Sequence, residues 1–197
     1  MNQHHLRIVV ADDERDVRDY FADVLPDLGH ELLGSAKTGQ ELVELCRLYQ
    51  PDLVISDVRM PEKDGLDAVR ELNAERFTPV IIVTAFHDST TLGRATDAQV
   101  FAYLVKPFER PQLESAIEVA WTRFTQFQNV RDEAQSLRQA LEDRKIIERA
   151  KGILMKQAGV DEEQAFRRLR KLARDKQKRL SEIAEMIVTA HEAMGDL

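Results

Sequence analysis

The sequence predicts an α/β fold in which a five-stranded, doubly wound parallel sheet is followed by a long helix and a small three-helix unit. Apolar runs alternate with amphipathic segments from residue 6 to about residue 125, which is typical of strand–helix–strand units with right-handed crossovers. Pro111 then opens a segment that contains no further Gly or Pro until Gly152. A basic segment closes the chain, which at 197 residues suits one ordinary domain and a smaller second one.

Each predicted strand is a short apolar run bounded by turn residues. The expected strands are 6–11, 31–36, 52–57, 79–84 and 100–105. The segments between them repeat apolar residues at helical spacing. The expected helices are 14–28, 39–49, 65–75 and 88–97.

The segment after Pro111 is predicted to be one long helix, since Pro suits the first helical turn. Its apolar residues recur in steps of three and four, the spacing of a coiled coil. They are Leu113, Ile117, Ala120, Phe124, Phe127, Val130, Ala134, Leu137 and Leu141. Some 40 helical residues would reach about 60 Å, too long for one globular domain to bury. We expect residues 111–147 to be a coiled-coil linker that pairs two protomers; the alternative is a helix that folds back on its own domain.

Residues 137–193 are predicted to form a three-helix unit whose first helix continues the long one. Asp161 and Gln164 have the spacing of a capping box and predict the start of a second helix. Ser181 is the expected N-cap of a third. Gly152 interrupts the first helix at a cost of about 1 kcal/mol relative to Ala, so we expect a close contact with another helix there.

Charge is unevenly distributed along the chain, whose formal net charge is −7. Residues 1–140 carry 15 Lys and Arg against 24 Asp and Glu, whereas residues 141–180 carry 13 against 7. A change of sign between segments indicates different partners for the two parts. The acidic part suits a divalent cation, and the basic part suits a polyanion.

Cysteine usage and hydropathy indicate a cytoplasmic setting. Cys46 is the only cysteine, so no internal disulfide can form, and its apolar surroundings predict a small buried side chain. No stretch reaches the roughly 18 apolar residues of a membrane span, and we expect no membrane partner. The N-terminal apolar run leads directly into carboxylates, unlike a signal peptide.

Polar residues follow four of the predicted strands. "LRIVVADDE" ends in Asp12 and Asp13, "PDLVISD" in Asp57, "PVIIVTA" in Thr84, and "FAYLVKPF" brings Lys106. The carboxyl ends of parallel strands meet at one edge, where open α/β sheets bind ligands. The sequence therefore predicts one site built from three carboxylates, a hydroxyl and an ammonium group.

These residue types point to phosphoryl chemistry. Asp12, Asp13 and Asp57, with the backbone carbonyl of Arg59, offer the hard oxygen ligands that Mg²⁺ prefers. A carboxylate beside Mg²⁺ can accept a phosphoryl group and form an aspartyl phosphate. Lys106 would neutralise phosphoryl charge, and the Thr84 hydroxyl, on a fourth strand, could donate a hydrogen bond to one of the phosphoryl oxygens.

Residues 5–125 resemble a response-regulator receiver domain, which has a CheY-like, flavodoxin-type fold. The matching stretches are "VVADDE", "PDLVISDVRMPEKDG", "PVIIVTA" and "YLVKPF". The resemblance implies a receiver at residues 5–122 in which a sensor histidine kinase phosphorylates Asp57. It also implies that Tyr103 is a switch aromatic that turns inward when Thr84 moves, and that a cis bond precedes Pro107. Gln99 departs from the family, which usually has Gly there.

Residues 137–190 resemble an ANTAR domain, an RNA-binding module of transcription antitermination regulators. "ERAKGILM", "AFRRLRKLA" and "IAEMI" carry the resemblance, which implies binding to paired RNA hairpins and favours a homodimer. Arg144, Lys151 and Arg170 are the candidate RNA contacts. At Ala173, Arg174 and Gln177 the chain departs from the family, so the resemblance does not define an RNA sequence preference.

Three other functions remain open at this point. A basic three-helix tail also suits a DNA-binding transcriptional response regulator. A Mg²⁺-dependent phosphatase that uses Asp57 is less favoured, because such enzymes commonly have an acid where this chain has Arg59. A phosphotransfer module would act through protein partners alone. The expectation is a regulator and not an enzyme.

Overall fold

The computed structural model describes residues 4–85 and 100–195. These residues form two compact units, residues 1–128 and residues 129–197. The expected helix at 88–97 and the departure at Gln99 lie outside the described residues. The predicted domain and linker boundaries remain predictions.

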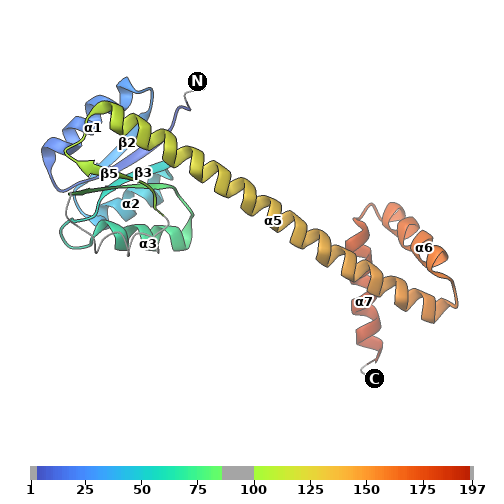
Figure 1. The fold of residues 1–197 in the computed structure, drawn as a ribbon. Coiled ribbons are helices and arrows are strands. Elements are labelled where there is room, and N and C mark those ends of the chain that lie inside the picture. Colours follow the sequence, from blue (N-terminus) through green and yellow to red (C-terminus); the bar gives the residue numbers. More distant parts are fainter. Residues whose placement is uncertain (1–3, 86–99, 196–197) are drawn as a thin grey trace. The chain divides into compact units, whose positions relative to one another are not determined.

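The first unit contains the predicted five-stranded parallel sheet (Figure 1). Its strands are β1 (Arg7–Ala11), β2 (Glu31–Ala36), β3 (Leu53–Asp57), β4 (Val80–Ala85) and β5 (Val100–Lys106). Their order is β2-β1-β3-β4-β5, and every neighbouring pair is parallel. The doubly wound fold is confirmed, with each strand end within one residue of the expected one.

Helices cover both faces of this sheet (Figure 1). On one face, α1 (Arg15–Asp27) and the start of α5 (Arg110–Ala158) pack over Ile8 and Val10 of β1. On the other face, α2 (Gly39–Tyr49) and α3 (Gly65–Glu75) cover Val9 and Ala11. Strand β1 is therefore buried on both faces, as expected for a parallel sheet.

Cys46 lies in α2 within the second of these cores, as the sequence predicts. Burial raises the pKa of its thiol to about 12, although the nearby charge of Arg76 acts in the opposite direction. The side chain therefore behaves as a small apolar group.

Helix α5 has two differently covered stretches. Leu113, Ile117 and Ala120 are buried against the sheet. Further along, Phe124 and Phe127 pack against Phe77 and Phe101 in an aromatic cluster of tilted and edge-to-face rings, with centroids 5.1–6.3 Å apart. Between Val130 and Leu141 the large apolar residues are exposed: Val130 by 66%, Leu137 by 60% and Leu141 by 59%. The early part of the helix thus folds back on its own domain, while the later part presents an uncovered apolar stripe.

The second unit packs the end of α5 against α6 (Glu162–Asp175) and α7 (Leu180–Gly195), which confirms the three-helix prediction. Its core consists of six buried side chains. They are Ala150, Ile153, Leu169, Ile183, Ala184 and Val188. Among the described residues, no helix has the length and hydropathy needed to span a membrane.

One of the two predicted caps in this unit is correct. The Asp161 side chain accepts a hydrogen bond from the Gln164 N–H at 2.7 Å, as expected for an N-cap. Ser181 is not a cap, because α7 already begins at Leu180 and Ser181 is buried inside it. Instead, Glu182 accepts a hydrogen bond from the Arg179 N–H at 2.7 Å and satisfies a backbone donor at the start of the helix.

The expected helix contact at Gly152 is also wrong. Gly152 lies inside the continuous helix α5, and a Cβ atom at this position would have no atom of the described residues within 4 Å. Packing among the described residues therefore does not explain why a residue that weakens the helix occupies this position.

Gly65 fixes the loop that follows the phosphoryl-acceptor candidate Asp57. A Cβ at Gly65 would lie 1.9 Å from the Asp57 carbonyl oxygen and 2.6 Å from Ser56 Oγ. The Gly65 N–H also donates to the Val58 carbonyl at 2.8 Å. The first turn of α3 can thus rest directly on the end of β3 only because no side chain intervenes.

Replacement of Gly65 by Ala should destabilise the first unit by about 1–3 kcal/mol, because the new methyl group overlaps backbone atoms that cannot move independently. Urea unfolding followed by circular dichroism measures the loss. Gly34→Ala is the matched control, since its Cβ would meet only side-chain atoms, of Leu45 at 3.4 Å and of Tyr49 at 3.8 Å. An equal effect of the two substitutions would contradict this explanation.

Candidate functional site

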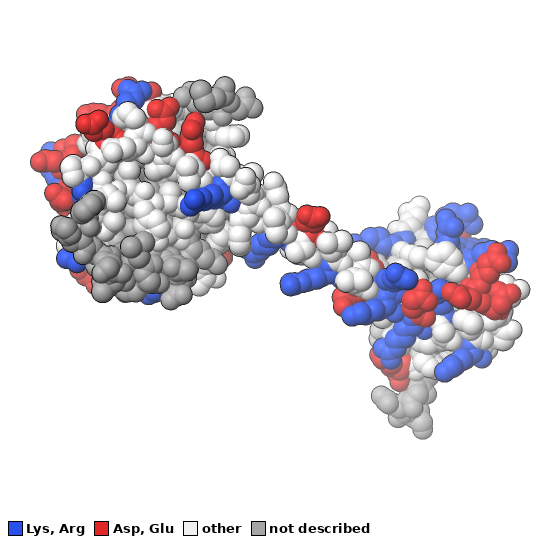
Figure 2. Space-filling view, viewed as in Figure 1, with Lys and Arg blue, Asp and Glu red and all other residues white. Residues whose placement is uncertain are grey.

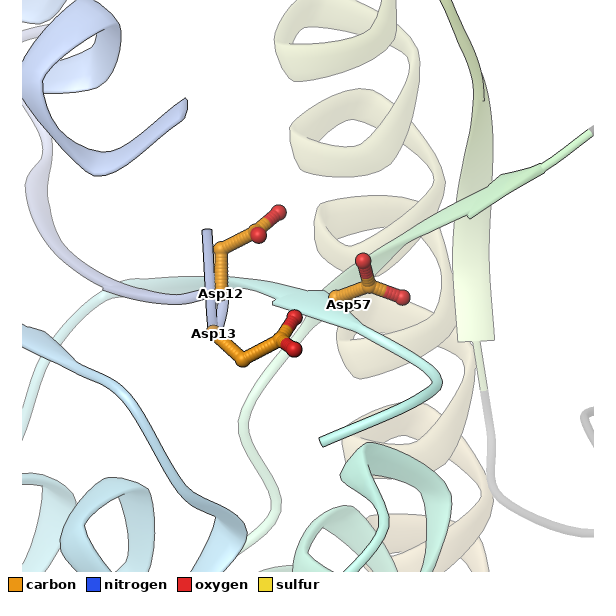
Figure 3. Close-up of side chains that lie close together, drawn as sticks. All are labelled: Asp12, Asp13 and Asp57. Atoms are coloured by element: carbon orange, nitrogen blue, oxygen red, sulfur yellow. The ribbon is translucent and has the colours of Figure 1, made fainter. Parts of the chain in front are cut away.

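The carboxylates of Asp12, Asp13 and Asp57 gather at one edge of the sheet (Figure 3). Asp12 and Asp13 directly follow β1, and Asp57 is the last residue of β3. Because β1 and β3 are adjacent parallel strands, their ends bring one carboxylate oxygen from each residue within 4.8 Å of the others. The structure thus brings together the three acids that the sequence singled out.

Asp12 lies in the least solvated position of the three. Its side chain is fully buried, and burial raises the pKa of its carboxyl group despite opposing contacts with Lys106 and the Glu14 N–H. Oδ1 accepts a hydrogen bond from the Glu14 N–H at 3.0 Å. Oδ2 lies 2.8 Å from Lys106 Nζ but outside hydrogen-bonding geometry, so this buried oxygen has an ionic partner and no hydrogen bond.

Lys106 neutralises this cluster. It ends β5, and the bond to Pro107 is cis, as the resemblance implies. Its Nζ lies 2.7 Å from Asp57 Oδ2 and 2.9 Å from Glu14 Oε1. Burial alone would lower the pKa of the ammonium group, but its contacts with the three carboxylates outweigh burial and raise the pKa above its ordinary value. Lys106 therefore carries a permanent positive charge beside Asp57.

A polar pocket of about 390 Å³ opens above these groups. Residues from the loop after β1, from the ends of β3, β4 and β5, and from the loop after β3 line it. They are Asp13, Glu14, Asp57, Val58, Arg59, Thr84, Ala85 and Lys106. The Arg59 N–H donates to Asp57 Oδ1 at 3.0 Å, and the Thr84 hydroxyl donates to the Ala85 carbonyl at 3.3 Å. The pocket therefore combines an acceptor carboxylate with a cation and a hydroxyl group.

Tyr103 lies apart from this pocket. It sits on β5 three residues before Lys106, and 38% of its surface is exposed. Partial burial raises the pKa of its phenol group. Its role as a switch aromatic remains a prediction.

Two residues of the site were not predicted from the sequence. Glu14 is the third carboxylate on Lys106, and Arg18 Nη1 donates to the carbonyl oxygens of Asp12 and Asp13 at 2.7 and 2.9 Å. Arg18 thus fixes the backbone that carries both acids. The dense charges of "DDERDVR" were the available signal, but they do not indicate which groups face inward.

The donor set fits a magnesium ion. All three acids offer hard carboxylate oxygens, and one of these oxygens is buried without a hydrogen bond. Mg²⁺ is typically bound by one or two carboxylates together with waters and phosphate oxygens. Asp12, Asp13 and Asp57 are therefore suitable ligands, with the Arg59 backbone beside the same pocket.

The candidate RNA contacts differ in accessibility. Lys151 is buried, with 10% of its side chain exposed; its Nζ lies 2.8 Å from both Glu148 and Glu162. These hydrogen bonds raise its pKa. The ammonium group also lies 5.7 Å from the Phe166 ring centroid. Lys151 therefore joins α5 to the first turn of α6.

Arg144 and Arg170 are exposed. The Arg170 guanidinium lies 5.9 Å from the centroid of the Phe166 ring that Lys151 also approaches. Figure 2 shows Lys and Arg side chains spread over the surface of the second unit, with acidic groups among them. Arg144 and Arg170 can thus reach a ligand without losing a buried partner.

Comparison with protein families identifies both parts of the chain. Residues 8–118 match the response regulator receiver domain, and residues 135–188 match the ANTAR domain. Both are regulatory families. The basic three-helix unit is therefore the ANTAR domain, and the sheet with its carboxylate edge is the receiver.

Individual relatives agree with this assignment. Transcriptional regulatory protein PdtaR of Mycobacterium tuberculosis is 41% identical over 182 residues, which cover 92% of this chain and 89% of that protein. The receiver domain of a modulated diguanylate cyclase from Desulfovibrio desulfuricans superimposes with a TM-score of 0.57 at 27% identity, over 61% of this chain and 96% of that one. NtrX from Brucella abortus gives a TM-score of 0.59 at 26% identity, over 66% of this chain and 29% of that one. The chain belongs to the response regulators that combine a receiver domain with an ANTAR domain.

Proposed function

We propose that this protein is a phosphorylation-controlled transcription antiterminator. A sensor histidine kinase phosphorylates Asp57, and the ANTAR domain binds RNA hairpins near a terminator. The contact of Lys106 with Asp57 at 2.7 Å, at an edge shared with Asp12 and Asp13, is the observation that carries the phosphorylation step. The RNA step rests on the family match and the exposed cations of the second unit.

The chemistry follows from the residues around the pocket. A carboxylate oxygen of Asp57 attacks the phosphorus of a phosphohistidine; an O–P bond forms while the N–P bond breaks. Lys106 contacts the transferred phosphoryl group and balances its charge. Bound Mg²⁺ would supply further neutralisation of the carboxylates and the phosphoryl oxygens. Asp12, Asp13, Asp57 and the Arg59 carbonyl are its proposed ligands.

Thr84 and Tyr103 transmit the change. In the described structure the Thr84 hydroxyl donates to its neighbour's carbonyl, a weak contact of 3.3 Å. A phosphoryl oxygen is a stronger, charged acceptor and would draw that hydroxyl into the pocket. The proposed consequence is an inward turn of the half-exposed Tyr103 ring, which alters the surface of β5.

Pairing of two chains is proposed along the exposed stripe of α5. In heptad terms Ala134 and Leu141 occupy a positions, and Val130 and Leu137 occupy d positions. The exposure of this apolar stripe and its a/d spacing support a coiled-coil seam. Two tails held together gain effective concentration on an RNA that carries two hairpins.

Charges beside the stripe favour a parallel pair. Glu133 at a g position faces Arg138 at an e position of the second copy when the helices run in the same direction and in register. In an antiparallel pair, e positions face one another, and Arg131, Arg138 and Lys145 would repel. The parallel arrangement also brings both tails to the same end of the coil.

Phosphorylation should increase RNA binding by this protein. With beryllofluoride and Mg²⁺ as the phosphoryl mimic, gel-shift affinity for a two-hairpin RNA should rise about tenfold or more. The reason is that a dimer presents two tails at once. Asp57→Asn, or removal of Mg²⁺ by a chelator, should abolish the increase.

The matched comparison uses promoter duplex DNA of equal length and salt concentration. Stronger binding to the DNA than to the hairpin RNA would support the DNA-binding alternative and sink the antiterminator proposal.

Charge reversal tests the parallel coil. Glu133→Arg should weaken dimerisation by about three- to tenfold in analytical ultracentrifugation with beryllofluoride, because it converts two attractive pairs into repulsive ones. Combining it with Arg138→Glu should restore pairing. Asp132→Arg, on the outer face of the same helix, is the control of equal charge change. A double variant as weak as the single one would exclude the proposed register.

Lys151 and Arg170 should respond differently to substitution. Lys151→Gln should lower the thermal unfolding midpoint by several degrees, because Glu148 and Glu162 lose their shared partner. Arg170→Gln should leave the midpoint nearly unchanged and weaken RNA binding only. Circular dichroism and fluorescence anisotropy separate the two effects. If Arg170→Gln were destabilised, or if Lys151→Gln were as stable as the wild type, the structural role of Lys151 and the binding role of Arg170 would both be in the wrong place.

A further inference from the structure

Gly152 weakens helix α5, and no contact among the described residues accounts for its presence there. It lies within α5, and a side chain at this position would meet no atom of the described residues within 4 Å. Glycine in a helix interior is commonly explained by close approach of another group. The described residues supply no such group, so the space beside Gly152 is open to a partner outside them.

Three cations share the face of α5 that carries Gly152. Lys145, Arg149 and Lys156 are spaced at −7, −3 and +4 from Gly152, so they align with it along one ridge. All three are exposed. The ridge is thus a row of basic side chains with a gap at the glycine.

The cations of this ridge are accessible to a new partner. Lys145 pairs with Glu142 and Arg149 pairs with Glu192, each at 2.7 Å, and all four side chains are more than half exposed. Exposed ion pairs contribute little to stability, so a phosphate could replace either acid. Lys151 on the adjoining face is different, because it is buried between two glutamates.

The charge of the ridge favours a polyanion over a second copy of the chain. If two such ridges faced each other, their cations would be juxtaposed, and like charges oppose association. The apolar stripe that suits pairing comes earlier in α5, from Val130 to Leu141. A phosphate backbone, by contrast, is attracted by the cations and can approach the helix closely where there is no Cβ.

We infer that RNA contacts the ANTAR domain along the ridge of Lys145, Arg149, Gly152 and Lys156, with Gly152 as the point of closest approach of the RNA backbone. The inference rests on the proposed RNA-binding function and specifies its surface. It adds these residues to Arg144 and Arg170; Lys151, whose ammonium group pairs with Glu148 and Glu162, is not part of the ridge.

The test separates stability from binding in the full-length chain. The wild-type protein first selects a bound sequence from a library of two-hairpin RNAs with randomised loops, and that RNA is the probe. Gly152→Ala should raise the thermal unfolding midpoint by a few degrees, because Ala favours the helix and meets no clash. The same variant should bind the probe at least tenfold more weakly in fluorescence anisotropy.

The cations supply a second readout. Lys145→Gln, Arg149→Gln and Lys156→Gln should each weaken binding by about three- to tenfold and reduce the slope of log affinity against log salt by about one. Arg167→Gln is the control, since this exposed cation on α6 also pairs with a single acid, Glu163, and lies off the ridge.

The outcomes distinguish the inference from the proposed function. If the wild-type chain selects no RNA from the library, the RNA-binding function fails. If it selects one and Gly152→Ala and the three ridge variants bind as the wild type does, the function stands and the ridge is wrong. A changed molar mass of Gly152→Ala in light scattering, with unchanged RNA affinity, would assign the ridge to a second copy instead.

Discussion

The receiver depends on holding like charges together at one edge of its sheet. Asp12, Asp13 and Asp57 place their oxygens within 4.8 Å, and Asp12 is fully buried. Such an arrangement is unfavourable unless a cation offsets it. Lys106, at the end of β5, pairs with Asp12 after β1 and with Asp57 at the end of β3. Neutralisation of the carboxylates therefore requires that β1, β3 and β5 keep their positions relative to one another in the sheet. The same electrostatic demand makes the edge receptive to a divalent ion.

Much of this arrangement can be predicted from the sequence because it depends on strand ends. A buried parallel strand needs a continuous apolar run, so the position of Asp57 after "LVIS" is fixed by the pattern itself. Glu14 and Arg18 could not be assigned in this way. They follow the strand, and their roles depend on which direction each side chain takes at the start of α1. The prediction of Ser181 as an N-cap was wrong for a related reason. A hydroxyl near the start of a helix is a common capping signal, but here the backbone N–H that needed an acceptor is that of Arg179, and Glu182 accepts its hydrogen bond.

The long helix shows where a one-dimensional pattern loses information. Leu113 and Leu137 occupy equivalent places in one apolar repeat, yet the first is buried and the second is 60% exposed. Their difference arises from the sheet and from Phe77 and Phe101, residues distant in sequence that cover only the early turns. In the sequence, Lys151 is likewise one of many basic residues. In the structure its ammonium group is held between Glu148 and Glu162. Periodicity identifies a face, but what covers that face is a property of the folded chain.

The buried thiol of Cys46 has a consequence for how the protein can be switched. Burial raises the pKa of this thiol to about 12, so at neutral pH the group stays protonated and the reactive thiolate is scarce. It is also the sole cysteine of the chain. Two copies therefore have no ready route to a disulfide between them. A regulator that must return to rest when its signal ends is thereby protected from being trapped in one state.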